Sequence, residues 1–338
     1  MKLLRRLLFP FSILYWAVTA FRNYLYDKGW KKATSFDVPV IGVGNLSVGG
    51  TGKTPMVEYL IKMLSPYYRT ATLSRGYKRK SQGFVLADTG TTVEQIGDEP
   101  FQYHSKYKNI RVAVDADRVE GVRRLLHEIN DLQLVILDDA FQHRKIKAGF
   151  YILLTAYEDP FYDDMLLPSG NLRESASGVH RADIVIVTKC PTDLSENEQQ
   201  TIKKCIDKPA DRIFFSAIEY APYVTNGKEE LSEQELGNNF VAVAGIAKPQ
   251  YFYRHLNRNA KDTVTFPDHH HFSAADVQKI LKLAAGRKIV TTEKDYMRLQ
   301  ALVPANVLYY LPIQMKLLAD HELFENAVDA FVTSRVKV

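Results

Sequence analysis

Short apolar runs separated by helical patterns dominate the first two thirds of the chain. Residues 38–45 form a short run rich in β-branched side chains, with a glycine near its end. This run predicts a buried strand. A glycine-rich loop follows, and then a helix over about residues 54–65. Further strands are predicted at 69–74, 110–114, 132–137, 151–155 and 184–188, with a helix over 118–129. Strands that alternate with helices form βαβ units, so this region predicts an α/β fold with a mostly parallel sheet.

A second, smaller α/β block begins after residue 214. Strands are predicted at 240–245, 263–266 and 288–292, and helices at 249–258 and 273–285. The polar segment before them contains Asn226-Gly227, a typical hairpin turn. We therefore divide the chain into an N-terminal helix at 1–30, a larger core at 31–215, a linker hairpin at 216–238 and a smaller α/β domain at 239–338.

The N-terminal region combines an uncharged apolar run with basic flanks. The run from Leu7 to Phe21 has 15 residues, and a helix that spans a membrane needs about 20. Polar side chains recur at helical spacing and form one narrow stripe, opposite a wide aromatic and aliphatic face; they are Arg5, Ser12, Thr19, Asn23 and Tyr26. This pattern predicts an amphipathic helix associated with a membrane surface. A secretory signal peptide and a helix buried against the core remain alternatives.

Composition and charge narrow the class of protein further. The chain has 338 residues, 46% of them hydrophobic, which is sufficient for a sizeable core. With 44 basic and 39 acidic residues the net charge is +5, a mild excess that suits anionic partners but does not indicate nucleic acid. Cys190 and Cys205 form no CxxC pair, so neither a disulfide framework nor a cysteine zinc site is expected.

The loop after the first strand has the sequence of a phosphate-binding loop. Residues 44–54 read GNLSVGGTGKT, and the expected strand and helix flank them. Glycines allow backbone N–H groups to surround phosphate oxygens, and the helix N-terminus adds partial positive charge. The nucleotide-binding residues predicted from this motif are Gly49, Gly50, Thr51, Gly52, Lys53 and Thr54. Lys53 is expected to reach the β- and γ-phosphates of ATP, and Thr54 to offer its hydroxyl to Mg²⁺. The usual first glycine of the pattern is Ser47 here.

An apolar strand that ends in two carboxylates supplies the second half of such a site. Residues 134–139 read LVILDD, which places Asp138 and Asp139 at the carboxyl end of the strand. A carboxylate in this position faces Mg²⁺ directly or through water. The sequence does not rank the two residues as the metal-side ligand. Together with the phosphate loop they predict a P-loop NTPase core.

The motifs together resemble one family of lipid kinases. They are GNLSVGGTGKTP, LSRGY (73–77), GDEP (97–100), LDDAFQHR (137–144), LLPSGNLRE (166–174), TKCP (188–191), FPDHHHF (266–272) and TTEKD (291–295). This set, spread over nearly the whole chain, is similar to that of the tetraacyldisaccharide 4′-kinases, which phosphorylate a lipid A precursor. That family also lacks the usual first glycine of the phosphate loop, so Ser47 fits it.

The resemblance implies both a reaction and a location. ATP, with Mg²⁺, would donate its γ-phosphoryl group to the 4′-hydroxyl of an acylated glucosamine disaccharide 1-phosphate. Family members are P-loop proteins with a second, smaller α/β domain, and the active site lies between the two. They work at the cytoplasmic face of the inner membrane of Gram-negative-type bacteria. A membrane surface is therefore an expected partner of this chain.

The resemblance also implies a catalytic pair, Asp98 of GDEP and His269 of FPDH. The attacking hydroxyl loses a proton as the new P–O bond forms, and a positioned carboxylate with a histidine can accept it. The two residues are 171 positions apart and belong to different predicted domains, so they meet only if the domains close. Arg173 is a further catalytic candidate, because it is suited to stabilising phosphate charge.

Several polar residues are weaker candidates for the site. Arg118 and the basic cluster at 75–80 suit contacts with substrate phosphate, but structural roles explain them equally well. Gln142, His143 and Glu174 lie beside stronger motifs and have no assigned role. His269, His270 and His271 also suggest a metal cluster, although three consecutive residues do not point at one ion from regular structure.

Two other functional classes remain as alternatives. A P-loop GTPase or metallochaperone would account for the phosphate loop and for Thr188-Lys189, which match half of a guanine-reading motif. Pro191 stands where the guanine-binding Asp would be, and this argues against that class. A membrane-bound ATP-binding regulator without kinase activity is the other alternative.

Overall fold

Two β-sheets organise the chain in the computed structural model, which describes Arg5 and residues 7–336. The larger sheet has nine strands in the order β15-β8-β7-β6-β1-β5-β2-β4-β3. Its strands are β1 (Val40–Asn45), β2 (Thr70–Ser74), β3 (Val85–Leu86), β4 (Arg111–Val114), β5 (Leu134–Asp138), β6 (Phe150–Ala156), β7 (Ile184–Thr188), β8 (Ile213–Tyr220) and β15 (Ile313–Leu317). The inner seven strands run parallel, and β3 and β15 pair antiparallel at the two edges. The predicted parallel α/β sheet is confirmed.

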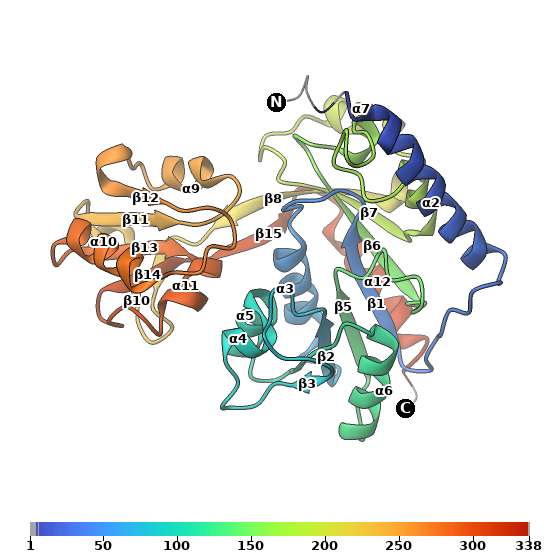
Figure 1. The fold of residues 1–338 in the computed structure, drawn as a ribbon, viewed down its shortest axis with the longest axis horizontal. Coiled ribbons are helices and arrows are strands. Elements are labelled where there is room, and N and C mark those ends of the chain that lie inside the picture. The colour runs from blue at the N-terminus through green and yellow to red at the C-terminus, as the bar shows by residue number, and fades with distance from the viewer. Residues whose placement is uncertain (1–4, 6, 337–338) are drawn as a thin grey trace.

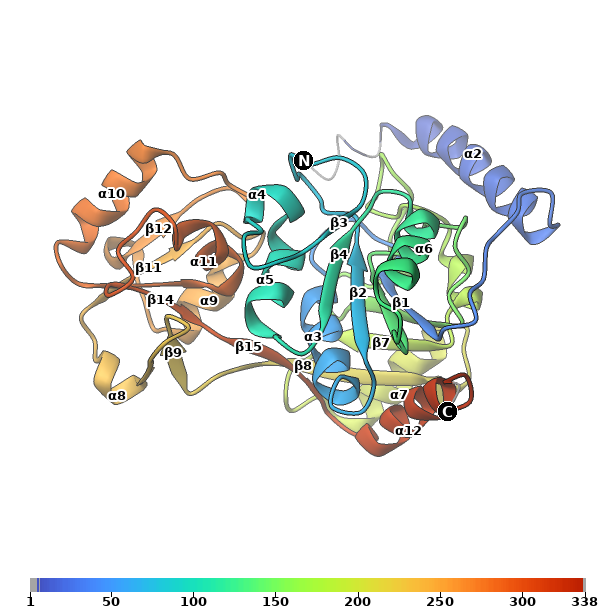
Figure 2. The ribbon, with the colours of Figure 1, turned by 90° about the horizontal axis from the view of Figure 1, so that it is seen from below.

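Helices cover both faces of this sheet (Figures 1 and 2). They are α3 (Lys53–Leu64), α4 (Val93–Ile96), α5 (Asp98–Lys106), α6 (Arg118–Glu128), α7 (Glu196–Cys205) and α12 (His321–Thr333), with short 3-10 turns at Phe161–Asp163, Ala176–Arg181 and Ala210–Arg212. On one face Ile41 of β1 packs in a cluster with Leu60 of α3 and Phe324 of α12. On the other face Leu73 of β2 packs with Leu125 of α6. The alternation of buried side chains along the strands thus gives the sheet two apolar faces, one for each layer of helices.

The second unit is a six-stranded sheet in the order β10-β9-β14-β13-β11-β12. Its elements are β9 (Tyr223–Thr225), β10 (Glu230–Ser232), α8 (Glu233–Leu236), β11 (Phe240–Ala244), α9 (Pro249–His255), a 3-10 turn (Ala260–Asp262), β12 (Thr263–Thr265), α10 (Ala274–Ala284), β13 (Lys288–Thr292), α11 (Glu293–Leu299) and β14 (Leu308–Leu311). The predicted turn at Asn226-Gly227 joins β9 and β10, which pair antiparallel, so this hairpin is an edge of the smaller sheet.

The chain crosses between the units twice, along the neighbouring strands β8 and β15 (Figure 2). The sequence division assigned all of 239–338 to the smaller domain, but β15 and α12 belong to the larger unit. The physical reason is burial, because Met315, Phe324 and Val328 complete the apolar cluster around α3. The sequence of the polar segment before β11 did not indicate that the chain goes back to the larger unit after β14.

The N-terminal helix α2 (Phe9–Asp27) lies along the outside of the larger unit (Figure 1). Residues 1–4 and 6 of the segment predicted at 1–30 lie outside the described residues. The polar stripe faces the protein, and Ser12 and Thr19 are only 4% and 8% exposed. The apolar side chains of Phe11, Leu14 and Phe21 are 62–65% exposed on the opposite side. This orientation is the reverse of a helix that packs its apolar face on a core.

Polar contacts fix α2 in that orientation. The Ser12 hydroxyl donates to the Leu166 carbonyl at 3.1 Å and bonds Ser169 at 2.9 Å, and the Tyr15 hydroxyl donates to the Arg173 carbonyl at 2.8 Å. Among the helices that the structure describes, none is both long enough and apolar enough to cross a bilayer.

The carboxyl ends of the parallel strands meet at one edge of the larger sheet. The phosphate loop follows β1, the paired aspartates end β5, TKCP follows β7 and LSRGY follows β2. Since β1 lies between β5 and β6 in the sheet, the first two of these motifs are direct neighbours. Ligands of open α/β sheets bind at this edge. The candidate site therefore lies there, on the side from which α5 and the smaller unit approach.

Candidate functional site

The phosphate loop connects β1 to α3 with two glycines in left-handed backbone conformation. Gly49 has φ +111° and Gly52 has φ +86°, which side chains with a Cβ rarely adopt. The loop is held on one side by the Thr188 hydroxyl, which donates to the Thr51 carbonyl at 2.8 Å, and by Lys189, which donates to the Gly50 carbonyl. On the other side the Val48 amide donates to the Asn171 carbonyl at 2.8 Å. TKCP and LLPSGNLRE therefore shape the loop.

Gly44, three residues before Ser47, is required by close packing. A Cβ added there would lie 2.6 Å from the Cβ of Phe141 and 2.9 Å from its backbone nitrogen. Phe141 follows the paired aspartates, so the glycine allows the end of β1 and the turn after β5 to approach each other. Gly44 therefore serves the packing of β1 against this turn.

Lys53, Asp139 and Arg173 form one charged cluster at the end of β1. The Lys53 ammonium lies 3.6 Å from Asp139 Oδ1 and 3.4 Å from the Asn45 side-chain oxygen. Arg173 donates to both oxygens of Asp139, at 3.2 and 3.0 Å, and also to the Asn45 carbonyl at 3.0 Å. Burial acts to raise the pKa of Asp139, but Lys53 and Arg173 outweigh it and hold the pKa well below its usual range. Two cations around one ionised carboxylate leave a net positive charge that suits phosphate oxygens.

Asp138 lies beside this cluster in a different environment. Its side chain is buried, and Oδ2 accepts a hydrogen bond from the Tyr103 hydroxyl at 3.3 Å. Oδ1 is buried without a hydrogen-bond partner among the described residues. Burial raises the pKa of Asp138 to about 6. Thr54 lies in the first turn of α3 and Asp138 at the carboxyl end of β5, so both belong to the same edge of the sheet.

The two environments distinguish Asp138 from Asp139 as candidates for the metal-side ligand, which the sequence alone does not do. Asp139 already has both oxygens engaged by Arg173 and Lys53. Asp138 Oδ1 is buried and has no hydrogen-bond partner in the described residues, and an ionised carboxylate in such a position is costly unless a cation compensates it. The donor set of Asp138 and the Thr54 hydroxyl is all oxygen, as Mg²⁺ prefers.

Asp98 and His269 come together from the two units. Asp98 begins α5, and His269 lies in the loop between β12 and α10 with φ +57°. His269 Nδ1 is 3.2 Å from Asp98 Oδ2. Arg298 of α11 donates from Nε to Asp98 Oδ1 at 2.7 Å and from Nη2 to Oδ2. Burial acts to raise the pKa of Asp98, but the hydrogen bonds from His269 and Arg298 prevail and hold the pKa well below its usual range.

The three consecutive histidines do not converge on one point. While His269 faces Asp98, His270 Nε2 lies 3.0 Å from Asp276 and its ring stacks on Phe266 at 4.7 Å. One group in the described part of the chain has the spacing of a cation site, namely Asp98, Glu99 and His269. The Lys294 ammonium stands 3.6 Å from Glu99 and 2.8 Å from His269 Nε2, so a protein cation already fills that position.

Hydrogen bonds of Glu174 and Gln142 connect the segments that carry the site. Glu174 is fully buried and accepts from Asn23 of α2 at 2.9 Å, from Gln142 at 2.9 Å and from Arg181 at 2.6 Å. Gln142 also donates to the Asn45 carbonyl at 2.8 Å. Glu174 therefore links the N-terminal helix to the segment that carries Arg173.

Arg118 and His143 lie deep beside the same strand ends. Arg118 is 2% exposed and donates to the carbonyls of Asp115 and Ala116 at 3.2 Å, with Nη2 3.4 Å from the Asp138 carbonyl. Burial lowers the pKa of Arg118 to about 10 and that of His143 to about 4. These carbonyl contacts give Arg118 a structural role in the turn after β4.

The basic cluster at 75–80 divides into two pairs. Arg79 donates to the Val114 and Gly83 carbonyls, and Lys80 pairs with Glu94 at 2.7 Å. Arg75 and Lys78 are exposed. The Tyr77 ring between them contacts the His269 ring edge-on at 5.3 Å, which places this cluster beside His269.

Sequence reasoning did not single out Asn45, Tyr103, Lys294 or Arg298. Asn45 and Lys294 fell inside the quoted motifs GNLSVGGTGKTP and TTEKD, so those motifs carried the signal for them. Tyr103 and Arg298 had no such signal, because their importance follows from contacts with Asp138 and Asp98 that are distant in sequence.

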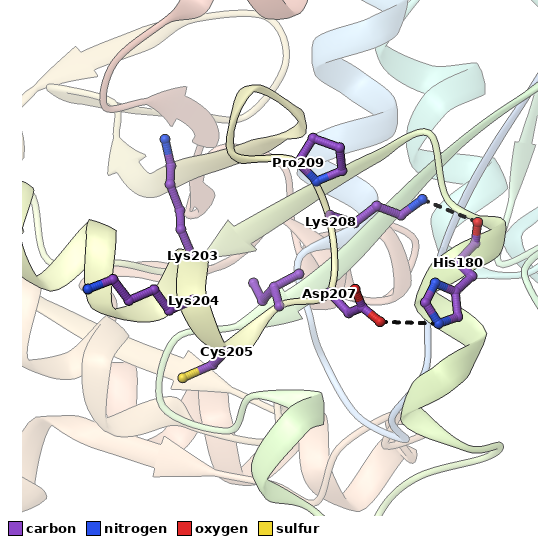
Figure 3. Close-up of a pocket in the computed structure, with 8 residues that line it drawn as sticks. His180, Lys203, Lys204, Cys205, Asp207, Lys208 and Pro209 are labelled. Carbon is purple, nitrogen blue, oxygen red and sulfur yellow. Dashed lines mark hydrogen bonds and ion pairs between the residues drawn. The ribbon is translucent and has the colours of Figure 1, made fainter.

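A separate depression lies at the C-terminal end of α7 (Figure 3). His180 Nε2 is 3.3 Å from Asp207 there, and Lys208 donates to the His180 carbonyl at 3.2 Å. None of the predicted site residues lines it. The chemistry described above therefore belongs to the strand edge and not to this depression.

Comparisons with known proteins find relatives over the whole chain. The sequence profile of the family described as "Tetraacyldisaccharide-1-P 4'-kinase" matches residues 4–333. A "Tetraacyldisaccharide 4'-kinase" of Flavobacterium johnsoniae is 52% identical, with 100% of both chains covered. One of Bacteroides fragilis is 44% identical over 93% of this chain and 89% of its own. The crystal structure of LpxK from Aquifex aeolicus in complex with ATP has a TM-score of 0.79 and 31% identity, and the match covers 97% of this chain and 99% of that one.

Proposed function

This chain belongs to the tetraacyldisaccharide-1-P 4'-kinase family, and we propose that it transfers the γ-phosphoryl group of ATP to the 4′-hydroxyl of a tetraacyldisaccharide 1-phosphate in lipid A biosynthesis. The observation that carries the proposal is the placement of two sites at one edge of the sheet. Lys53, Asp139 and Arg173 surround a phosphate position, and Asp98 and His269 form a proton-accepting pair beside them. The GTPase and regulator alternatives account for the first site but not for the second.

Phosphoryl transfer requires charge stabilisation more than covalent chemistry from the protein. The loop amides from Gly49 to Thr54 and the N-terminus of α3 bind the phosphates. Lys53 lies over the end of β1, where it contacts the β- and γ-phosphates, and Arg173 neutralises charge on the group in transfer. Asp139 orients both cations through the contacts described above.

Mg²⁺ is the metal that this donor set fits. Asp138, whose buried Oδ1 has no hydrogen-bond partner within the described part of the chain, and the Thr54 hydroxyl at the start of α3 would hold the ion. When bound, Mg²⁺ supplies positive charge that offsets the charge developing on the phosphate oxygens. Asp138 rather than Asp139 is our choice for the metal-side carboxylate.

Asp98 and His269 take the proton from the attacking hydroxyl. The hydroxyl oxygen forms its bond to the γ-phosphorus as the bond to the bridging oxygen of ADP breaks, and the proton passes to the pair. The pair is assembled only where the smaller unit meets α5, so the arrangement of the two units decides whether the base is present.

The exposed apolar face of α2 suits a lipid surface. Its polar face is held by Ser12, Tyr15 and Asn23, and this leaves the aromatic and aliphatic side chains directed away from the protein. A helix of this kind buries its apolar face in the headgroup layer. We place the enzyme at the cytoplasmic face of the inner membrane, where ATP and an acylated substrate are both accessible.

The test uses ATP labelled at the γ-phosphate together with the tetraacyldisaccharide 1-phosphate in detergent micelles. Label is expected in a bisphosphorylated lipid, and both Lys53→Ala and Asp98→Ala should abolish it. If nucleotide binds but no label reaches the lipid, the substrate assignment is wrong. If Asp98→Ala retains wild-type turnover while Lys53→Ala is inactive, the catalytic pair is wrong.

A further inference from the structure

The polar side of α2 contacts the segment that carries Arg173. Four polar side chains recur along the helix at spacings of three and four residues and therefore lie on one side; they are Ser12, Tyr15, Thr19 and Asn23. Three of them hydrogen-bond residues of the segment 166–174, which contains Arg173. The helix with the exposed apolar face thus meets the larger unit beside the phosphate site.

The backbone of Arg173 is held from both sides. Its carbonyl accepts from the Tyr15 hydroxyl at 2.8 Å, and its amide donates to the Leu46 carbonyl at 2.7 Å. Leu46 lies between the end of β1 and the glycines of the phosphate loop. Because both backbone groups are engaged, the Arg173 side chain extends toward Asp139 from a fixed position.

Asn23 acts on the next residue, Glu174. This carboxylate is fully buried, and the Asn23 side-chain amide donates to its Oε2 at 2.9 Å. The other two donors are Gln142, from the turn after β5, and Arg181, at the end of the following 3-10 turn. A buried carboxylate is costly unless it is paired and hydrogen-bonded. α2 therefore supplies one of the donors that keep Glu174, and with it Arg173, in place.

The C-terminal end of α2 contacts the segment that carries Asp139. Asp27, the last residue of α2, accepts from Arg144 at 2.6 Å, and the Arg144 guanidinium lies 5.3 Å from the centre of the Tyr26 ring. Arg144 belongs to the motif LDDAFQHR, which begins with the paired aspartates. The two partners of the ion pair between Arg173 and Asp139 thus lie in segments that both contact α2.

The placement of Arg173 depends on such contacts. Residues 166–174, all within the described part of the chain, lie outside the helices and strands, and Leu172 pairs through isolated bridges with Ser47 and Leu166. The regular hydrogen bonding of a helix or a sheet therefore does not fix this segment. A catalytic group that is misplaced by about 1 Å can cost about 10²-fold in rate, even when the cause is distant from the chemistry.

We propose that Tyr15 and Asn23 are positioning residues for phosphoryl transfer, which hold Arg173 at the phosphate position from the polar side of α2. The helix then has a separate role on each side, because its apolar side suits the lipid surface and its polar side supports the active site. Neither residue touches the reacting atoms. The inference deepens the proposed kinase function and rests on the role of Arg173 in it.

The first test is the kinetics of the full-length protein with saturating ATP and the tetraacyldisaccharide 1-phosphate in detergent micelles. Tyr15→Phe removes one hydroxyl and Asn23→Ala removes one amide, and the two substitutions together should lower kcat about tenfold or more. Tyr67→Phe, at a tyrosine that is 78% exposed in the turn after α3, is the matched control and should leave kcat unchanged. Wild-type kcat in the double variant would overturn the proposal.

The second test determines whether the loss of kcat depends on Arg173. In an Arg173→Ala background the double substitution should change kcat by less than about twofold, because the side chain that it positions is absent. A lower fraction of folded protein, or a general loosening of the larger unit, would instead reduce kcat by the same factor in both backgrounds. That additive result would contradict the proposal, so the double-mutant cycle distinguishes positioning from a merely structural role.

Binding to liposomes separates the two sides of α2. The double variant keeps the apolar side chains, so its partitioning into vesicles of phosphatidylethanolamine and phosphatidylglycerol should match that of wild type. If partitioning and kcat fall together, Tyr15 and Asn23 act through membrane attachment and the positioning role is wrong.

The outcomes distinguish this inference from the proposed function. If the wild-type protein labels the lipid and Arg173→Ala is impaired, while the double variant turns over like wild type, the role of α2 is wrong and the kinase assignment stands. If Arg173→Ala itself turns over like wild type, the proposed role of Arg173 fails and the inference fails with it.

Discussion

The ammonium of Lys106 lies 2.6 Å from the carboxylate of Glu293, across the boundary between the two units. Lys106 ends α5 and also pairs with Glu58 of α3 at 2.7 Å, while Glu293 begins α11. The same two helices carry Asp98 and Arg298 at their other contact. The docking of α11 on α5 therefore holds Arg298 against Asp98, and Lys106 supplies a cation to the same contact.

Lys106→Met should strongly destabilise the protein. Glu58 and Glu293 are both 3% exposed, and removal of Lys106 leaves two buried carboxylates without a countercharge. Breaking such a pair from one side costs about 3–5 kcal/mol. Thermal unfolding should show a clear fall in Tm, and Lys108→Met, at an exposed position on the same segment, should not. Equal Tm values for the two variants would show that the buried pair contributes nothing.

The buried carboxylates also predict a pH dependence. Burial and the neighbouring Glu58 raise the pKa of Glu293 from 4.5 to about 7. A raised pKa in the folded state favours the protonated form of Glu293. Its contribution to the free energy of unfolding is therefore fully present below the unfolded pKa and is lost as pH rises through about 7. Glu293→Gln removes the titration, so its stability relative to wild type should increase between pH 5 and pH 8, by up to about 3 kcal/mol. Denaturant unfolding of both proteins across this pH range is the measurement. A difference in unfolding free energy that stays constant with pH would contradict the raised pKa of Glu293.

Arg173→Ala should lower kcat by about 10² to 10³, the range for removal of one charge-stabilising donor in a transition state. Arg173→Lys should recover only part of the lost kcat, because lysine does not reproduce the two parallel hydrogen bonds to Asp139. Arg212→Ala, an exposed arginine before β8, is the control. A loss confined to KM for ATP would instead assign Arg173 to ground-state binding.

Asp138→Asn should weaken Mg²⁺-dependent nucleotide binding more than metal-free binding. The buried Oδ1 oxygen has no partner among the residues that the structure describes, so its charge is available to a cation. Calorimetric titration of ATP with and without Mg²⁺ measures both affinities in each variant. Asp139→Asn is the comparison, and it should affect the two affinities equally, because Asp139 acts through Lys53 and Arg173. The reverse pattern would make Asp139 the metal-side residue.

The double substitution Leu14→Ser and Val18→Ser should weaken binding to liposomes by about tenfold or more, since two apolar side chains no longer leave water. Both lie on the exposed face of α2, at 65% and 62% exposure. Leu302→Ser with Leu323→Ser removes two exposed leucines elsewhere and should leave partitioning unchanged. Deletion of residues 1–25 should act in the same direction and raise the apparent KM for lipid. Unchanged partitioning of the Leu14 and Val18 variant would exclude α2 as the lipid-binding element.

The sequence by itself determined the local elements and the motif chemistry. Apolar runs of strand length set β1, β5 and β7, and glycines at 49 and 52 set the phosphate loop, because these depend on neighbours along the chain. The family and the P-loop core followed from motifs of contiguous residues. The polar stripe of α2 was visible too, but not that it faces the protein, since periodicity defines two faces without saying which one is covered.

Only the tertiary structure decided how distant segments combine. In the folded chain, β15 and α12 belong to the larger unit, and Asp138 and Asp139 have different surroundings. Arg298 contacts Asp98, which is 200 positions away in the sequence. A carboxylate's charge state depends on burial and on the donors around it, and neither is encoded by its neighbours in sequence. Arg298 was therefore beyond the motifs, because its contact with Asp98 exists only when α11 lies against α5.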